Sequence, residues 1–119
     1  MSAASDQARR TLRALNVLAK WRTLLAGWQL GTRPKGDPAC DAVSDHREVT
    51  LLLRAEVSAL TGVLLAKGVV TDDEWAAALE QEAQALNRAL ETRFPGVTAS
   101  ETGLQMDRRV LPWMKGWKP

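Results

Sequence analysis

The residues of this sequence that could do chemistry are few, and they begin with its single histidine, His46, and its single cysteine, Cys40. As a general base, His46 would need a nucleophile or an acidic orienting group beside it, and Asp45 and Glu48 are not spaced to form a triad with it. Cys40 has no base at a suitable spacing that could activate its thiol. We therefore expect a half-buried or interface histidine, an inert cysteine, no catalytic residues and no enzymatic activity.

Metal and phosphate chemistry are not expected either. The acidic run Asp72–Glu74 crowds together as metal ligands do, but helix capping accounts for all three residues, and Trp-Ala-Ala-Ala follows where a calcium loop would contain glycine. One cysteine and one histidine are too few for a structural zinc site. Gly31 and Gly36 are too far apart for a phosphate-binding loop. We expect no metal, no cofactor and no small-molecule substrate.

Charge is distributed unevenly along the chain, whose formal net charge is +2. Residues 1–36 sum to +6, residues 37–67 to −2, residues 68–96 to −4 and residues 97–119 to +2. The basic end can attract the acidic middle, within one molecule or between neighbours, or it can meet phosphate. Its basic side chains alternate with apolar helical positions, which favours the protein interpretation. A nucleic-acid site at this end would consist of Arg9, Arg10, Arg13, Lys20 and Arg22.

Length and composition predict one folded domain with a sizeable core. With 45% hydrophobic residues the chain is not of the disordered class, and at its length about two-thirds of the unfolded surface can be buried without a disulfide or a metal. No apolar run approaches about 18 residues, and the start has no basic region followed by an apolar stretch. We therefore expect synthesis in the cytoplasm, no signal peptide, no transmembrane helix and no membrane partner.

Apolar side chains at helical spacing predict a first helix over about residues 6–30 and a second over about residues 38–67, with a glycine- and proline-rich connector between them. The second helix is apolar around so much of its circumference that we expect two neighbours to sandwich it. The apolar stripes comprise Ala14, Leu18, Trp21, Leu25 and Trp28 in the first helix, and Val43, His46, Thr50, Leu53, Val57, Leu60 and Leu64 in the second.

The turn before the third helix, about residues 72–93, carries the clearest local signals. Gly68 closes the second helix because a residue without a Cβ tolerates the left-handed conformation of the cap. Thr71 and Glu74 then form a capping box at the start of the third helix. Such a short turn favours a tight antiparallel or strongly bent hairpin of the two helices. Phe94–Gly96 ends the third helix.

After the third helix the helical spacing is lost. Val97–Ala99 and Leu104–Met106 flank a Ser-Glu-Thr-Gly turn, which predicts either a small β-hairpin or extended coil. We therefore predict an all-α protein, a three-helix bundle or hairpin with an irregular or β-hairpin C-terminal extension. Residues 1–96 would form the helical domain, and residues 97–119 the extension and docking tail.

Two of the five tryptophans lie in the C-terminal tail, residues 111–119, outside any regular element. The others, Trp21, Trp28 and Trp75, lie on apolar stripes and are expected in the core or between helices. Tryptophan and basic residues dominate binding hot spots, so the tail could dock on a partner, and it could equally fold back over its own helices. The predicted partner-binding residues are Trp113, Met114, Lys115 and Trp117.

Two resemblances extend this interpretation. Residues 60–79, with Lys67–Thr71 at their centre, resemble the helix–turn–helix pattern of short C-terminal oligomerisation motifs of bacterial proteins. The whole chain is similar to small helical proteins encoded in the structural gene clusters of bacteriophages and prophages of high-GC bacteria. The segments that carry this similarity are Trp28–Arg33, Asp45–Thr50, Lys67–Thr71, Arg93–Gly96 and Met114–Pro119.

The second resemblance implies a virion structural or assembly protein that has no catalytic residues. Its partners would be other phage structural proteins or copies of itself, and it would be found in the host cytoplasm and then in the virion. We therefore expect a non-enzymatic protein–protein interaction protein. The alternative is a small nucleic-acid-binding or host-takeover regulator that uses the basic first helix.

Overall fold

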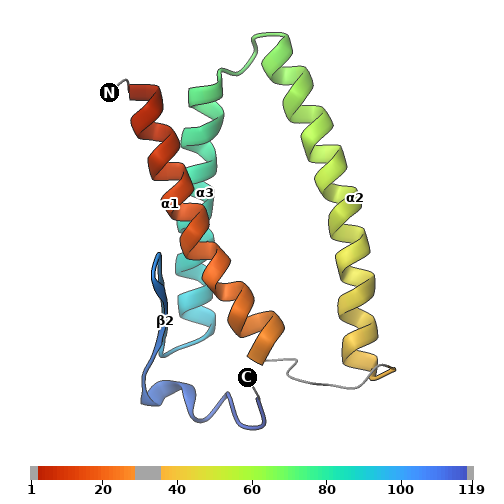
Figure 1. The fold of residues 1–119 in the computed structure, drawn as a ribbon, viewed down its shortest axis with the longest axis vertical. Coiled ribbons are helices and arrows are strands. Elements are labelled where there is room, and N and C mark those ends of the chain that lie inside the picture. The colour runs from red at the N-terminus through yellow and green to blue at the C-terminus, as the bar shows by residue number, and fades with distance from the viewer. Residues whose placement is uncertain (1–2, 29–35, 118–119) are drawn as a thin grey trace. The chain divides into compact units, whose positions relative to one another are not determined.

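The protein is described by a computed structural model over residues 3–28 and 36–117. Within these residues the chain is predominantly helical and ends in a small antiparallel hairpin, which confirms the predicted all-α fold with a β-hairpin extension. The regular elements are α1 (Ala3–Arg22), η1 (Thr23–Trp28), α2 (Pro38–Ala66), α3 (Asp72–Arg93), β1 (Val97–Ser100), β2 (Gly103–Met106) and η2 (Arg108–Val110) (Figure 1).

The first helix changes its winding part-way along. It is α-helical to Arg22 and continues as the π-helical stretch η1, whereas the sequence predicts one uniform helix over residues 6–30. A π-helix closes wider hydrogen-bonded rings than an α-helix, so it rotates the side chains that follow relative to the α-helical stripe. The predicted end of this helix, residues 29–31, lies outside the described residues.

Packing divides the chain into two compact units. The first consists of Met1–Gly31 with Asp73–Pro119, and the second is Thr32–Asp72. Every buried side chain among the described residues belongs to the first unit. This division brings the C-terminal extension into the same unit as α1 and α3, while the predicted boundary between residues 96 and 97 stays a prediction.

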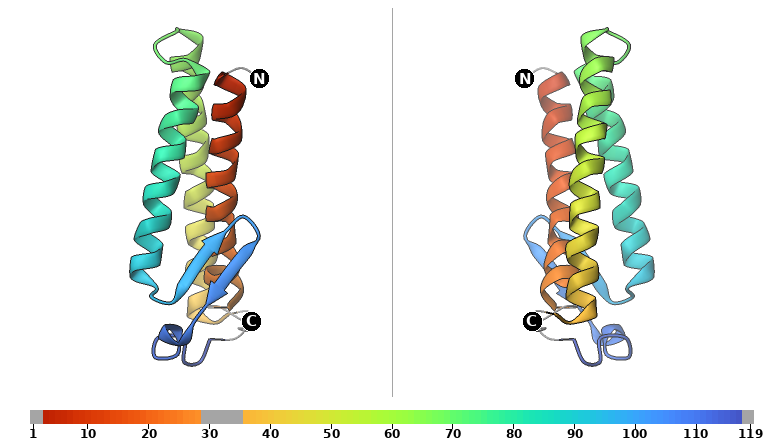
Figure 2. Two further views of the ribbon diagram at one scale, coloured as in Figure 1. Left: turned by 90° about the vertical axis from the view of Figure 1, so that its left-hand side faces the viewer. Right: turned by 90° about the vertical axis from the view of Figure 1, so that its right-hand side faces the viewer.

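Within the first unit, α1 and α3 run side by side, and polar side chains join them (Figures 1 and 2). Gln7 and Thr11, on α1, are buried with 7% and 6% of their surface exposed. Gln7 Nε2 donates to Glu80 Oε1 at 3.0 Å, and Thr11 Oγ1 donates to the carbonyl oxygen of Ala76 at 2.8 Å. Because a buried polar group without a partner is costly, these bonds favour one register of α1 against α3.

The hydrophobic core lies at the other end of the same helix pair. Trp21 and Leu24 are buried almost completely, with 2% and 0% of their surface exposed. Trp21 Nε1 donates to Asn87 Oδ1 at 2.8 Å, so the apolar ring is buried in the core while its N–H has a hydrogen-bond acceptor. The predicted α1 stripe is therefore the core face of this helix. The other buried residues of this cluster are Val97, Ala99 and Val110.

The predicted α3 stripe is buried only in part. Ala83 is buried and Leu90 packs against the core, but Trp75 and Leu86 are 42% and 50% exposed. Trp75 was expected in the core or between helices. It lies in the first turn of α3, where the contact with α1 is made through the backbone of the neighbouring Ala76, and nearly half of its surface remains accessible.

The hairpin pairs β1 with β2 in the register Val97 with Met106 and Ser100 with Gly103. Val97 and Ala99 are buried while Thr98 between them is exposed, the alternation of a strand with one face on the core. A two-stranded ribbon is marginal alone in water, so packing against α1 stabilises it (Figure 2).

A cap joins the hairpin to the C-terminal segment. Asp107 Oδ1 accepts the backbone N–H of Arg109 at 2.9 Å and begins η2. Hydrogen bonds from the Arg109 guanidinium and backbone hold the pKa of Asp107 below its usual value. The backbone N–H of Asp107 also donates to the carbonyl oxygen of Gly96 at 3.0 Å, which ties the end of the hairpin to its beginning.

The second unit consists mainly of α2 and its C-terminal cap. Gly68, with φ +69°, donates to the carbonyl oxygen of Leu65, and Val69 donates to that of Leu64, both at 3.1 Å. This pair of bonds is the Schellman arrangement, in which glycine takes the left-handed position. The predicted end of the second helix at Gly68 is confirmed, and α3 begins at Asp72, directly after Thr71, as the capping box predicts.

Candidate functional site

The tryptophans of the predicted docking tail pack against their own chain. The ring centre of Trp113 lies 5.2 Å from that of Phe94 and 5.3 Å from that of Trp117, with the two indoles edge to face. Trp113 Nε1 donates to the carbonyl oxygen of Pro95 at 2.8 Å. Met114 packs beside them against the core. The tail therefore folds back over α3 and the hairpin, which is one of the two arrangements expected for it.

Part of this tail is still accessible. Trp113, Met114 and Trp117 are half-buried, and Lys115 is exposed. A partner would thus meet a preformed aromatic cluster and would not have to order a free tail, which lowers the entropy cost of binding. Partner binding by these four residues stays a prediction.

Two of the five basic residues of the predicted nucleic-acid site are paired with acids. Arg9 forms an ion pair with Asp6, one turn earlier on α1. The Arg10 guanidinium donates to Gln7 Oε1 at 2.9 Å, and its Nε lies 3.8 Å from Glu80 Oε1. These two arginines therefore have less positive charge to offer a phosphate than the sequence suggests.

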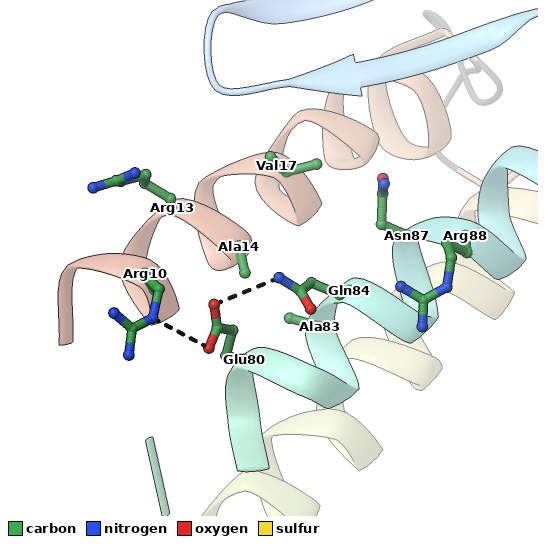
Figure 3. A pocket seen from close by; sticks show the side chains of 9 residues that line it. All are labelled: Arg10, Arg13, Ala14, Val17, Glu80, Ala83, Gln84, Asn87 and Arg88. Carbon is green, nitrogen blue, oxygen red and sulfur yellow. Dashed lines mark hydrogen bonds and ion pairs between the residues drawn. The ribbon is translucent and has the colours of Figure 1, made fainter. Parts of the chain in front are cut away.

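Arg10 and Arg13 line a groove of 420 Å³ between α1 and α3, which we call the arginine groove (Figure 3). Its third arginine, Arg88, comes from α3. The other two predicted basic residues lie elsewhere, because Lys20 lines a smaller hollow of 240 Å³ beside β2 and Arg22 is exposed at the end of α1. The residues lining the arginine groove are Arg10, Arg13, Ala14, Val17, Glu80, Ala83, Gln84, Asn87 and Arg88.

Arg88 was not among the site residues predicted from the sequence. This residue lies in the acidic stretch 68–96, whose net charge is −4, and no motif surrounds it. Only the packing of α3 beside α1 brings its guanidinium to the groove that Arg10 and Arg13 line. A charge count along the chain could not reveal this cluster, because it averages over neighbours in sequence and not in space.

The reactive residues of the sequence are not brought into a catalytic arrangement among the described residues. His46 is exposed on α2, where a half-buried or interface position was expected, and its carbonyl oxygen accepts a hydrogen bond from Thr50. The side chain of Cys40 lies outside the described part of the chain. Across residues 3–28 and 36–117, no group of three or more histidine, cysteine or acidic side chains is placed to hold a metal ion.

Most of the large apolar side chains that are exposed among the described residues belong to α2. Leu52 and Leu60 are 63% and 61% exposed, and the other large aliphatic side chains of the helix are similarly accessible. The apolar stripe Thr50–Leu64 has alternating spacings of three and four residues, the pattern on which a second helix packs. The exposed aliphatic residues of α2 are Val49, Leu51, Leu52, Leu53, Val57, Leu60 and Val63.

The segment Asp45–Ala66 of α2 is also long and apolar enough to cross a bilayer, with a mean hydropathy of 1.7 in its most apolar window. No such helix was expected from the sequence, because the apolar run is interrupted. Arg54 and Glu56 interrupt the run but leave the average high. Length and composition alone are therefore compatible with either a lipid or a protein environment for this helix.

Comparison with known proteins adds no further assignment: no family model matches the chain, and neither a curated protein nor a solved structure matches it.

Proposed function

We propose that this chain is a non-enzymatic protein that binds other protein chains through α2. The observation that supports this proposal is the exposed apolar surface of α2, on which seven large aliphatic side chains are each more than half exposed. Burying one such side chain contributes about 1.5–3 kcal/mol, so a surface of this size strongly favours association. On the resemblance of the sequence to phage structural proteins, we further propose that it is a structural or assembly component of a virion.

The partner of α2 in this proposal is another helix, from a second copy of this chain or from another structural protein. The spacing of Leu53, Val57 and Leu60 provides the ridge that a facing helix can pack against. A lipid environment is less favourable because Arg54 and Glu56 would lie inside the span. A charged side chain near the middle of a bilayer costs about 2.5–3.5 kcal/mol by insertion measurements.

The decisive variant introduces charge into the α2 stripe, by Leu53→Glu with Leu60→Glu. We expect the wild-type protein to form a complex that persists in high salt, since apolar contacts are not screened. The variant should have the mass of one chain by light scattering and keep its helix content by circular dichroism. The matched control, Arg47→Ala with Arg54→Ala, changes the net charge equally on the polar flank of the helix and should leave association unchanged.

A wild-type protein that has the mass of one chain, both alone and with candidate virion proteins, would contradict this function. So would loss of association in the control variant to the same extent. If the wild-type protein floats with neutral lipid vesicles, the partner of α2 is a membrane and not a protein helix. The virion part of the proposal is tested by mass spectrometry of purified particles and by whether the gene lies among virion genes.

The alternative function, nucleic-acid binding by Arg9, Arg10, Arg13, Lys20 and Arg22, is less well supported, because Arg9 and Arg10 are engaged by Asp6 and Glu80. This function requires an affinity for DNA or RNA that falls steeply with salt. A gel-shift experiment at low salt without retardation would remove it.

A further inference from the structure

The arginine groove has a positive charge that its own residues do not neutralise. Glu80, the one acidic residue lining it, faces Arg10 at 3.8 Å and also accepts a hydrogen bond from Gln7. In the described part of the chain Arg13 and Arg88 form no ion pair. The groove therefore retains the charge of two guanidinium groups, which are suited to binding carboxylates in bidentate geometry.

The base of the groove is apolar. Ala14 and Ala83 are buried, with 9% and 3% of their surface exposed, and Val17 lies beside them (Figure 3). Small side chains at these positions leave room for a side chain from outside. A ligand that matches this surface combines carboxylates with an adjacent apolar group, which describes an acidic protein segment better than it describes a phosphodiester backbone.

Such a segment exists on this chain, at the start of α3. Asp72 and Asp73 are exposed, and neither forms an ion pair among the described residues. Trp75, further along the same helix, is 42% exposed, so an accessible indole follows the two carboxylates. This acidic segment, Asp72–Trp75, is complementary to the arginine groove in its charge and in its apolar side chain.

Within one molecule this pairing cannot form at Arg88. Asp73 and Arg88 belong to the same helix, α3, which places them about 22 Å apart at about 1.5 Å of rise per residue. A rigid helix cannot fold back over that distance. A carboxylate from the acidic segment can reach the Arg88 side of the groove only from a second molecule.

We infer that the arginine groove of one copy binds the acidic segment Asp72–Asp73 of a neighbouring copy. This inference rests on the proposed function and adds a second contact to it. Each copy has both surfaces, so two copies can exchange the contact reciprocally in a two-fold dimer, or many copies can repeat it head-to-tail in a ring or filament. The contact depends on charge, and it must therefore weaken with salt, whereas contacts through α2 persist.

The test is sedimentation velocity of the full chain in low salt, about 0.02 M, and in high salt, about 0.5 M. In low salt we expect a species larger than the α2-dependent complex, and in high salt we expect that complex alone. Arg13→Glu with Arg88→Glu should weaken this salt-labile association about tenfold or more, as should Asp72→Asn with Asp73→Asn, which retains residues suited to a helix start. The control, Arg22→Glu with Arg108→Glu, changes the charge equally outside the groove and should associate as the wild type does.

Charge exchange gives the sharpest result. A chain that carries Arg13→Glu and Arg88→Glu together with Asp72→Lys and Asp73→Lys should recover the salt-labile association, because both surfaces are reversed. If the exchanged chain does not recover although circular dichroism shows it folded, the pairing is wrong. If the salt-labile step is absent in the wild type while the α2-dependent complex persists, this inference fails and the proposed function stands. Retardation of a DNA or RNA oligonucleotide that is lost only in the Arg13→Glu, Arg88→Glu variant would assign the groove to nucleic acid instead.

Discussion

Gly96 shows how a single residue joins the elements of the first unit. Its φ of +95° lies in the region that side chains with a Cβ rarely adopt. A Cβ at this position would lie 2.8 Å from Asp107 Oδ1 and 2.9 Å from both a side-chain carbon and the backbone nitrogen of Val110. The end of α3, the hairpin and the cap of η2 can therefore meet here only around a glycine.

We predict that Gly96→Ala destabilises the protein by about 2 kcal/mol or more, since strain at a positive φ adds to a steric clash. The free energy of unfolding, measured by urea denaturation with tryptophan fluorescence, checks this value. Gly116→Ala is the matched control, because Gly116 has a similar φ of +86° but open space around the added Cβ. Equal losses in the two variants would show that the crowding at Gly96 is unimportant.

At the scale of elements, the C-terminal tail is a structural part of the helical unit. Phe94, at the end of α3, is in aromatic contact with Trp21 of α1 and with Trp113 and Trp117 of the tail. The tail thus extends the core beyond the two helices. Removing it would expose Phe94 and part of the core, so a loss of partner binding after truncation at Leu111 has to be distinguished from a loss of stability.

Single substitutions make that distinction. We predict that Trp113→Ala lowers the free energy of unfolding by about 1–3 kcal/mol, less than for a fully buried tryptophan, because the ring is half-buried and its Nε1 bond to Pro95 is lost. Trp75→Ala, at a more exposed indole, should cost less. If Trp113→Ala leaves the free energy of unfolding unchanged, the inference that the tail contributes to the core is wrong.

At the scale of the whole molecule, the two units differ in how they use apolar residues. The first unit encloses a core and contains all five tryptophans, whereas α2 in the second has a large aliphatic surface and no tryptophan. Stability of the first unit and association through α2 are therefore expected to be separable properties. Tryptophan fluorescence then reports on the first unit alone.

We predict that replacing residues 32–72 by a flexible Gly/Ser linker of about 30 residues, long enough to join the end of η1 to the start of α3, leaves the first unit folded. Its tryptophan emission should be blue-shifted in the absence of urea and should change in one cooperative unfolding transition as urea is added. The association assigned to α2 should disappear. Light scattering and fluorescence on the same sample measure both properties. An unfolded first unit would show that its core depends on α2.

Much of the secondary structure follows from residues that are close in sequence. The Gly68 cap and the start of α3 after Thr71 were predictable, because caps and turns depend on neighbours in the chain. The two short strands on either side of Glu101–Thr102 were one of the two arrangements that the sequence predicted there, the other being extended coil. The stripe around Trp21 also indicated correctly which face of α1 is buried.

The candidate sites depend on contacts between distant segments, and local patterns do not contain them. Arg88 joins Arg10 and Arg13 only because α3 packs along one flank of α1, and Trp113 meets Phe94 only because the hairpin reverses the chain. Spacing along a helix tells which residues share a face, since the period of the helix is fixed. Which face meets which depends on the packing of the whole unit, and that arises only in the folded chain.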